Sequence, residues 1–329
     1  MIKKAASTTP AQAATHRVAT KKPSRPGAGV PTPPIPAGSA APSGAAPRER
    51  RQRVQSAQTG MAVLKGLARL GGRASLSNLA GYVSESPAKV HRYLVSLIEE
   101  GLVVQDSATQ QYLLGAEAMM IGVAAMRQAD PVRAAEPALV RLREALEVTS
   151  FVAVMGNMGP TIVRFEEPGL PVTVNVRVGS VMSLLWSSTG RVFLGLLDDS
   201  RVLALAQEEF RHAAPALRAL LEADEARDGT DNETLSHAGA PVNSLRRAVQ
   251  AEVEAHRCAS VKDTNLKGIS AVSAPLFDHT GRLCAVLTAL GATGGFDASP
   301  EGPVADALRR EAAAASALLG YAPPATRAA

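Results

Sequence analysis

Apolar residues between positions 75 and 115 are spaced as in two successive helices followed by two short strands. Residues three or four positions apart form the helical stripes: Leu76, Leu79, Ala80 and Val83, then Val90, Leu94, Leu97 and Ile98. The short apolar runs 102–104 and 111–114 are joined by the polar segment 106–110, which predicts a hairpin. This order of elements predicts a winged helix-turn-helix, in which one helix lies in the DNA major groove.

The second of these helices has clear start and stop signals. Ser86 is expected to cap its free N–H groups, and Pro87 suits the first helical position because its missing N–H costs nothing there. Gly101 is expected to end the helix in the left-handed conformation. Ser84 and Glu85 form the turn before it.

The face opposite the apolar stripe carries short or basic side chains: Ala88, Lys89, His91, Arg92 and Ser96. Lys89 and Arg92 can meet phosphates or guanine edges, and Ala88 can lie close to a thymine methyl group. Taken alone, such charges are more often a solvated helix face, but the helix-turn-helix setting favours contact with DNA. For His91 a phosphate contact and packing against the preceding helix are equally open.

The run from Ser56 to about Gly122 resembles the DNA-binding domain of IclR-family bacterial transcription regulators. The resemblance rests on the following residues: Val63-Leu64, Leu67, Leu79-Ala80, Val90-His91-Arg92-Tyr93-Leu94, Glu100-Gly101-Leu102-Val103 and Tyr112-Leu113-Leu114-Gly115. In place of the family's usual serine-threonine pair before the triplet stands Ala88-Lys89, which puts the operator sequence in doubt. The resemblance and the exposed face together predict these DNA-binding residues: Ser86, Ala88, Lys89, His91, Arg92, Gln110, Arg50, Arg51 and Arg53.

Most of the positive charge lies in the first 53 residues. Ten Lys and Arg face a single Glu there, a net charge of +9, so residues 54–329 carry −4 of the total of +5. This Pro- and Ala-rich segment lacks the apolar residues needed to fold, and we expect residues 1–53 to be disordered. The cluster 48–53 can add phosphate or minor-groove contacts, or it can simply keep the protein soluble. A transit peptide is a third interpretation that the bacterial resemblance disfavours.

From residue 131 onward the pattern predicts helices and antiparallel strands. Strands are expected at 151–155, 161–165, 171–178, 268–276 and 283–290, and helices at 188–197, 243–256 and 302–320, with another helix from residue 132. The stretch 207–242 is expected to be a loop or a short irregular helical insert. These elements predict an α+β domain with an antiparallel sheet and helices to one side.

This half resembles the effector-binding domain of the same family. The resemblance rests on the following residues: Val178-Gly179, Leu184 through Gly190-Arg191, Leu194, Gly268-Ile269-Ser270-Ala271, Ala274-Pro275 and Gly281. It implies a GAF-like antiparallel sheet with flanking helices. The predicted organisation is a tail at 1–53, a winged helix-turn-helix at 54–115, a linker helix at 116–130, an effector-binding domain at 131–321 and a tail at 322–329.

By resemblance, an effector lies between the sheet and the helix that begins near Ser188. The expected binding residues are Val174, Trp186, Ser188, Thr189, Asp263, Thr264, Ile269, Ala271 and Thr288. A helix N-terminus rich in hydroxyl groups suits an anion, although Ser and Thr there often only cap the helix. Trp186 can wall a pocket for an aromatic ligand, but a single Trp more often belongs to the core. A core role is also favoured for His256 and Cys258.

Catalytic motifs are absent from the sequence. It has no GxSxG, Walker A, HExxH or GxGxxG pattern, and its two cysteines, Cys258 and Cys284, lack the spacing of a zinc site. We therefore expect no enzyme activity, no cofactor and no metal, and a reduced cytoplasm as the compartment. No apolar run reaches the roughly 20 residues that span a bilayer.

Two functions from different classes remain. The first is a DNA-binding transcriptional regulator controlled by a small organic acid, aromatic acids included, which acts as a homodimer or homotetramer on a palindromic operator. The apolar residues of the linker helix are candidates for contact between copies: Met119, Met120, Ile121, Val123 and Met126. The second is a small-molecule-binding protein or an enzyme of acid metabolism with a vestigial DNA-binding domain.

Overall fold

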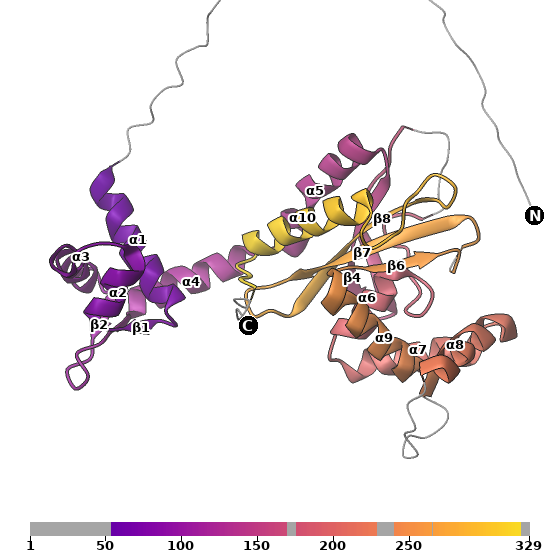
Figure 1. Cartoon of the computed structure of the whole chain (residues 1–329), viewed down its shortest axis with the longest axis horizontal. Coiled ribbons are helices and arrows are strands. Elements are labelled where there is room, and N and C mark those ends of the chain that lie inside the picture. The colour runs from indigo at the N-terminus through magenta and orange to yellow at the C-terminus, as the bar shows by residue number, and fades with distance from the viewer. Residues whose placement is uncertain (1–53, 170–175, 229–239, 265, 324–329) are drawn as a thin grey trace, which may run out of the picture. The chain divides into compact units, whose positions relative to one another are not determined.

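The computed structural model describes residues 54–169, 176–228, 240–264 and 266–323 (Figure 1). The predicted disordered tail, with Arg50, Arg51 and Arg53, lies outside these residues, and so does Val174.

Residues 55–114 form three helices and a small antiparallel sheet. The elements are α1 (Gln55–Arg69), β1 (Arg73–Ala74), α2 (Leu76–Val83), α3 (Pro87–Glu99), β2 (Val103–Gln105) and β3 (Tyr112–Leu114). The sheet has the order β1-β3-β2, so the short β1 extends the predicted hairpin. Ser75, which the sequence analysis did not single out, caps α2 by accepting a bond from the Asn78 N–H at 3.3 Å.

The boundaries of α3 agree with the sequence prediction. Two details differ, namely the capping bond expected of Ser86 and the burial expected of Ile98. Pro87 is the first helical residue and Gly101 has a φ of 67°, in the left-handed region. Ser86 occupies the cap position in extended conformation, but its side chain makes no capping hydrogen bond. Val90, Leu94 and Leu97 are buried, whereas Ile98 is exposed and does not belong to the core stripe.

Helix α4 (Ala116–Gln128) contains no buried residue. Its large apolar side chains are all exposed: Met119, Met120, Ile121, Val123 and Met126. None of the helices within the described residues is both long enough and apolar enough to cross a membrane.

The C-terminal domain is built on one antiparallel sheet of five strands. Its strands are β4 (Thr149–Gly156), β5 (Gly159–Glu166), β6 (Ala259–Lys262), β7 (Ile269–Phe277) and β8 (Leu283–Ala292), in the order β5-β4-β8-β7-β6. Strand β6 was missed by the sequence analysis. A strand was also predicted at 171–178, but the described residues of that range, 176–178, are not in a strand.

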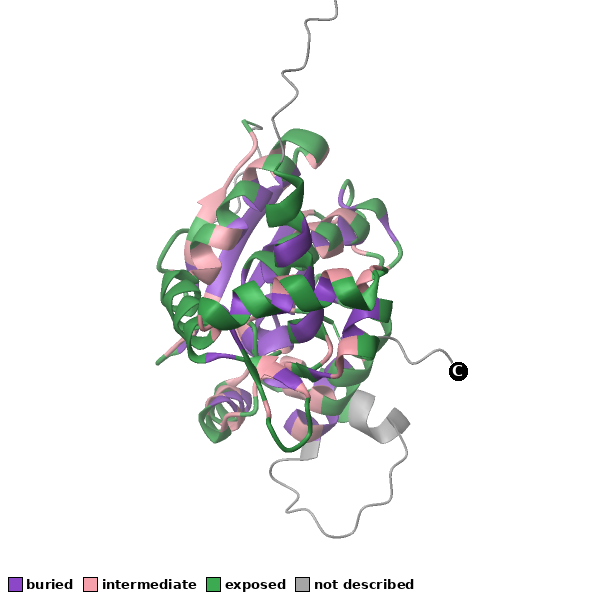
Figure 2. Cartoon of the chain, turned by 90° about the vertical axis from the view of Figure 1, so that its left-hand side faces the viewer, coloured by how far each residue is buried: buried purple, intermediate pink, exposed green. Residues whose placement is uncertain are grey.

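Helices cover both faces of this sheet, which corrects the prediction of helices to one side. One apolar core includes α6 (Ser188–Leu196) and α9 (Ala240–His256), and a second includes α5 (Pro131–Leu146) and α10 (Pro303–Leu318) (Figure 1). Phe151 on β4 belongs to the first core and the adjacent Val152 to the second. Figure 2 shows helices with buried residues on one side and exposed residues on the other.

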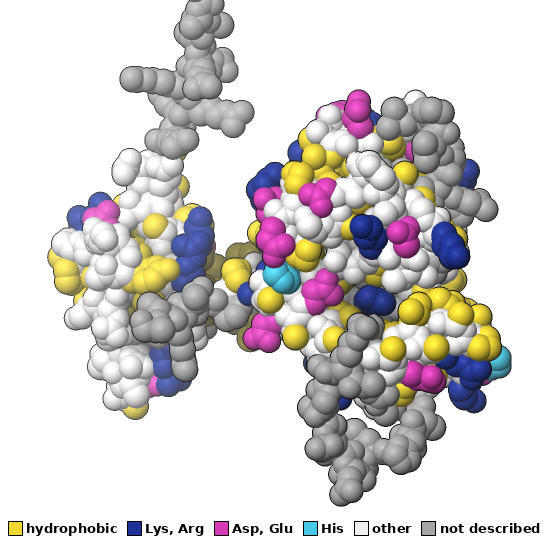
Figure 3. All heavy atoms as spheres, turned by 45° about the vertical axis from the view of Figure 1, so that its right-hand side comes forward, with side chains coloured by type: hydrophobic (Ala, Val, Ile, Leu, Met, Phe, Trp, Pro, Cys, Tyr) yellow, Lys and Arg dark blue, Asp and Glu magenta, His cyan; other side chains and the backbone are white. Residues whose placement is uncertain are grey.

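The stretch after α6 is more regular than expected. The sequence predicted a loop or a short irregular insert over 207–242, whereas the structure has α7 (Ser200–His212) and α8 (Pro215–Asp228). Asp199 caps α7 by accepting a bond from the Arg201 N–H at 2.9 Å. Acidic and basic side chains are interspersed on the face of the C-terminal domain seen in Figure 3.

Candidate DNA-binding surface and ligand cavity

The outer face of α3 is the candidate DNA-binding surface. Ala88, Arg92 and Ser96 are exposed on the side of the helix opposite its buried stripe. Arg92 forms no ion pair with any other described residue, so its guanidinium group is available to an acceptor on DNA.

Lys89 differs from Arg92 because it already has a partner. Its Nζ atom donates a hydrogen bond to Oε1 of Glu85 at 2.7 Å. Both side chains are about one-third exposed, at 34% for Lys89 and 31% for Glu85. Lys89 therefore enters any encounter with DNA as half of an ion pair.

His91 connects α3 to the wing rather than to the preceding helix. Its Nδ1 atom lies 3.2 Å from the hydroxyl group of Tyr112, a buried residue of β3. The bond involves one ring nitrogen, and the His91 residue as a whole is exposed. His91 can therefore position the wing relative to α3 while it presents its other nitrogen outward.

The turn of the wing is stabilised by its own polar groups. Gln110 has a φ of 57°, and its side-chain amide donates to the Ser107 carbonyl at 2.9 Å. The pKa of Asp106 is lowered from its usual value because its carboxylate accepts hydrogen bonds. The donors are the backbone N–H of Ala108 and the hydroxyl group and backbone N–H of Thr109. These bonds define the position from which Gln110 would meet DNA.

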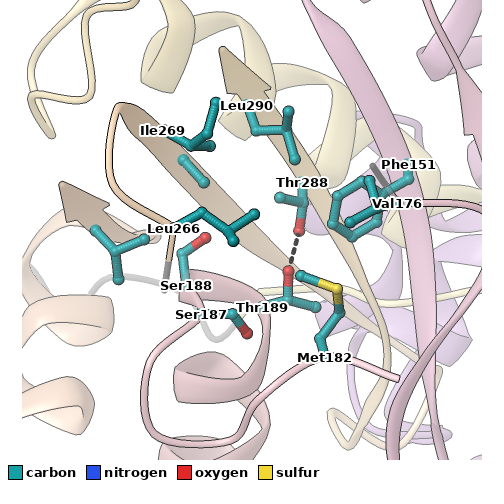
Figure 4. Close-up of a pocket in the computed structure, with 12 residues that line it drawn as sticks. Phe151, Val176, Met182, Ser187, Ser188, Thr189, Leu266, Ile269, Thr288 and Leu290 are labelled. Carbon is teal, nitrogen blue, oxygen red and sulfur yellow. Dashed lines mark hydrogen bonds between the residues drawn. The ribbon is translucent and has the colours of Figure 1, made fainter. Parts of the chain in front are cut away.

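A narrow cavity lies between α6 and the sheet of the C-terminal domain (Figure 4). It holds about 400 Å³ of atom-free space, counting the solvent at its mouth. Its lining is mostly apolar, with hydroxyl groups on one side: Phe151, Val176, Met182, Ser187, Ser188, Thr189, Val261, Leu266, Ile269, Ala271, Thr288 and Leu290.

The hydroxyl side of the cavity is the N-terminus of α6. Ser187 caps the helix, because its Oγ accepts a bond from the Gly190 N–H at 3.0 Å. The next two N–H groups, of Ser188 and Thr189, have no acceptor within the helix. They lie at the positive end of the helix dipole, which favours a negatively charged group.

Four buried hydroxyl groups join α6 to the two central strands. Ser188 Oγ lies 2.7 Å from Ser273 Oγ, and Thr189 Oγ1 lies 2.8 Å from Thr288 Oγ1. Ser273 and Thr288 are themselves 2.8 Å apart. Each of the four hydroxyl groups thus has a partner among the others, and those of Ser188, Thr189 and Thr288, which line the cavity, could exchange that partner for a polar group of a ligand.

The segment before α6 is anchored from two sides. Glu209 of α7 accepts hydrogen bonds from the Ser183 hydroxyl and, at 2.9 Å, from the Leu184 N–H. Thr264 donates to the Trp186 carbonyl at 2.8 Å. These bonds fix the approach of the chain to the cavity wall.

Comparisons with known proteins show which proteins this chain resembles. Residues 56–107 match the IclR helix-turn-helix domain. The crystal structure of Pseudomonas aeruginosa HmgR is 38% identical, with a TM-score of 0.69 over 82% of this chain and 100% of that one. The HTH-type transcriptional regulator BhcR of Paracoccus denitrificans is 26% identical over 67% of this chain and 71% of its own. The transcriptional repressor IclR of Escherichia coli is 24% identical over 49% of this chain and 59% of its own.

The chain belongs to the IclR family of transcriptional regulators. DNA is therefore a partner of this regulator, and the fold is the mixed helix and sheet fold of its relatives, with an N-terminal helix-turn-helix. Its relatives are transcriptional regulators and not enzymes.

The structure of this IclR-family regulator brings five of the predicted effector residues to the cavity: Ser188, Thr189, Ile269, Ala271 and Thr288. Trp186 is buried in the core, Thr264 binds its carbonyl group, and Asp263 accepts a bond from the Gly268 N–H at 2.7 Å. None of these three is part of the lining.

Several lining residues were missed by the sequence analysis, although a signal for some of them was present. Side chains two apart on a strand share a face, so Thr288 implies Leu290. Phe151 lies opposite Thr288 in the pairing of β4 with β8, which only the strand order reveals. Met182 and Leu266 lie outside helices and strands, where residue spacing carries no comparable signal.

Ser188 and His256, residue types that a hydrolytic enzyme can combine with an Asp in a catalytic triad, have other partners here. The hydroxyl group of Ser188 meets Ser273, and Nδ1 of His256 lies 3.2 Å from Glu301. Cys258 is buried in the core that includes α5 and α10, while the cavity-lining Phe151 belongs to the other core. The described residues hold no group of three His, Cys, Asp or Glu side chains placed for a metal ion.

Proposed function

We propose that this regulator binds its operator through α3 and the wing, and that a small organic acid in the C-terminal cavity controls its affinity for DNA. Aromatic acids belong to the expected effectors. The observation that carries this proposal is the N-terminus of α6, which opens onto a mostly apolar cavity beside the sheet. A DNA-binding regulator of this kind acts in the cytoplasm and does not act as an enzyme.

The chemistry of the lining supports an acid with an apolar body. No Lys, Arg or His is among the described residues that line the cavity, so a carboxylate would depend on N–H and hydroxyl donors. Ser188 and Thr189 supply these donors at the helix N-terminus. Phe151, Leu266 and Leu290 offer the apolar walls that suit a hydrocarbon or aromatic ring.

The effector test compares acids with their neutral amides, such as benzoate with benzamide, at equal concentrations. An acid that binds the folded protein raises its melting temperature by mass action. The same acid must change the affinity for an operator duplex, selected from a random library, because a ligand shifts an equilibrium only through unequal affinity for the two states. If acids and amides raise the melting temperature equally, the proposed anion site is contradicted, whereas the proposed DNA binding is not.

We also infer a homodimer or homotetramer on a palindromic operator. The exposed side chains of Met119, Val123 and Met126 recur along one side of α4, a pattern that a second copy can cover. Two α3 helices in a dimer would read half-sites about 10 bp apart or a multiple of that distance. Sedimentation of M119E/M126E beside the wild type tests this proposal. A mass unchanged by both substitutions contradicts the role of α4.

The alternative, an enzyme or binding protein with a vestigial DNA domain, predicts a different result with the double variant A88E/R92A. This variant must lose operator binding if α3 reads DNA, because an acid replaces a short side chain and a cation is removed. A circular dichroism spectrum that matches the wild type would show that the domain remains folded. Retained operator binding contradicts the proposed mechanism.

A further inference from the structure

The pair Glu85 and Lys89 stands out on the candidate DNA-binding surface because it places a carboxylate beside a cation. Glu85 lies in the turn before α3, where its backbone N–H donates to the Ala80 carbonyl at 3.1 Å. Its side chain borders a recess formed with Gln58, Thr59 and Ala62 of α1. The carboxylate is thus placed at the junction of the helices, one turn before Lys89.

The position of Lys89 on α3 explains what the carboxylate does to it. Successive residues of a helix are rotated by about 100°, so Arg92 lies opposite Val90, and Lys89 lies on the flank it shares with Tyr93. The Tyr93 ring faces α1, since a Cβ atom built on Gly60 would lie 3.5 Å from it. Glu85 therefore holds the Lys89 ammonium group on the α1 flank, while Arg92 lies on the outer face.

We propose that Glu85 is a specificity-determining residue, which holds Lys89 in one position and keeps it from binding phosphates of non-operator DNA. The proposal rests on the proposed DNA-binding function. One of the three N–H groups of Lys89 is bound to Glu85, and two remain for the acceptor atoms of a base edge. An ammonium group held in one position reaches a base edge only when α3 lies in the correct register on the DNA. A lysine without such a partner can bind any nearby phosphate.

This role has a measurable electrostatic consequence. The logarithm of the binding constant falls linearly with the logarithm of the salt concentration. Each phosphate that a cation neutralises makes this slope steeper by about 0.9. Glu85→Gln releases Lys89, so the slope for non-operator DNA steepens by about 0.9, and affinity at 0.1 M salt rises about fivefold to tenfold. Operator affinity stays within about twofold, so the ratio of operator to non-operator affinity falls.

The experiment uses the full chain as wild type, E85Q, K89Q and E85Q/K89Q, with E100Q as the matched control. Glu100 ends the same helix, is exposed, and loses the same charge. Fluorescence anisotropy is recorded from 0.05 to 0.3 M salt on two duplexes of equal length, one selected by the wild type from a random library and one unselected. We expect E85Q alone to steepen the slope on the unselected duplex and to have no effect in the K89Q background.

Three results would overturn the inference. The first is an equal gain of E85Q on both duplexes, and the second is a change no larger than that of E100Q. The third is an effect of E85Q that persists without Lys89, which would assign Glu85 a purely structural role. A wild type that selects no sequence at all overturns the proposed function, and the inference falls with it.

Discussion

The hydroxyl group of Thr189, in the first turn of α6, lies 2.8 Å from the hydroxyl group of Thr288 on β8 (Figure 4). Both residues are fully buried, and 98 residues of the chain separate them. A helix end and a central strand are thus joined by a polar bond inside an apolar cavity wall.

Thr288→Val should destabilise the C-terminal domain. The substitution keeps the shape of the side chain but removes a hydroxyl group that bonds to Thr189 and Ser273. Thr189 then keeps only the longer contact with Ser273 at 3.4 Å. Loss of a buried hydroxyl bond costs about 1 kcal/mol, which urea denaturation measures as a lower free energy of unfolding. Thr288→Ser keeps the hydroxyl group and serves as the control. A loss in Thr288→Ser but none in Thr288→Val would show that the methyl group, and not the hydroxyl group, stabilises this site.

Gly190→Ala should prevent correct packing of α6. A Cβ atom at this position would lie 1.9 Å from the Ser183 carbonyl oxygen and 2.6 Å from the Leu184 Cα, and backbone atoms cannot move aside as a flexible side chain can. We expect a loss of about 3 kcal/mol or more in the free energy of unfolding. Gly294→Ala, where a Cβ atom meets nothing within 4 Å, is the control. A normal unfolding curve for Gly190→Ala would contradict this geometry.

Tyr112→Phe should weaken DNA binding without changing its salt dependence. The variant removes the hydroxyl group that lies 3.2 Å from His91, so α3 and the wing lose a connection but no cation is lost. We expect the free energy of unfolding to fall by about 1 kcal/mol. Tyr82→Phe, in a residue with 48% exposure, controls for the loss of a hydroxyl group. A shallower salt slope for Tyr112→Phe would mean that a phosphate contact has been lost instead.

Cys284 should be unreactive at neutral pH in the folded protein. Burial raises the pKa of its thiol to about 11, because the thiolate loses contact with water. A raised pKa stabilises the fold below the pKa of the unfolded thiol, about 8.5, and this contribution is lost as the pH rises through about 11. Labelling by a thiol reagent at pH 7.5 should be slow until urea is added, and stability should fall between pH 9 and 11. Cys284→Ala should reduce this fall, and rapid labelling of the folded wild type would contradict the burial of the thiol.

The sequence predicted the fold well where local signals act alone. Pro87 marks the start of α3 because its ring fixes φ and it has no N–H, and Gly101 marks the end because glycine adopts the left-handed conformation without a Cβ clash. Ser86 was misread because many Ser residues at this position do cap, yet the side-chain bond depends on a rotamer that the sequence does not specify.

The prediction of helices to one side of the sheet was wrong, although the sequence carried a signal for a sheet covered on both faces. The run 151–155 is apolar at every position, which indicates a strand buried on both faces. The cavity was predicted in part, since Thr288 and Ala271 were found through resemblance. Phe151 could not be combined with them without the strand order, because only the pairing of β4 with β8 places it opposite Thr288.

The sheet that separates the two cores also separates the effects of substitutions on its two faces. Phe151 lines the cavity and its neighbour Val152 belongs to the opposite core, so alternate positions along one strand contribute to the cavity and to the second core. Substitutions at every second residue of β4, β7 and β8 can therefore change the lining of the cavity and leave the helical layer of α5 and α10 intact. The shape and polarity of the cavity can thus be altered without disturbing the second core.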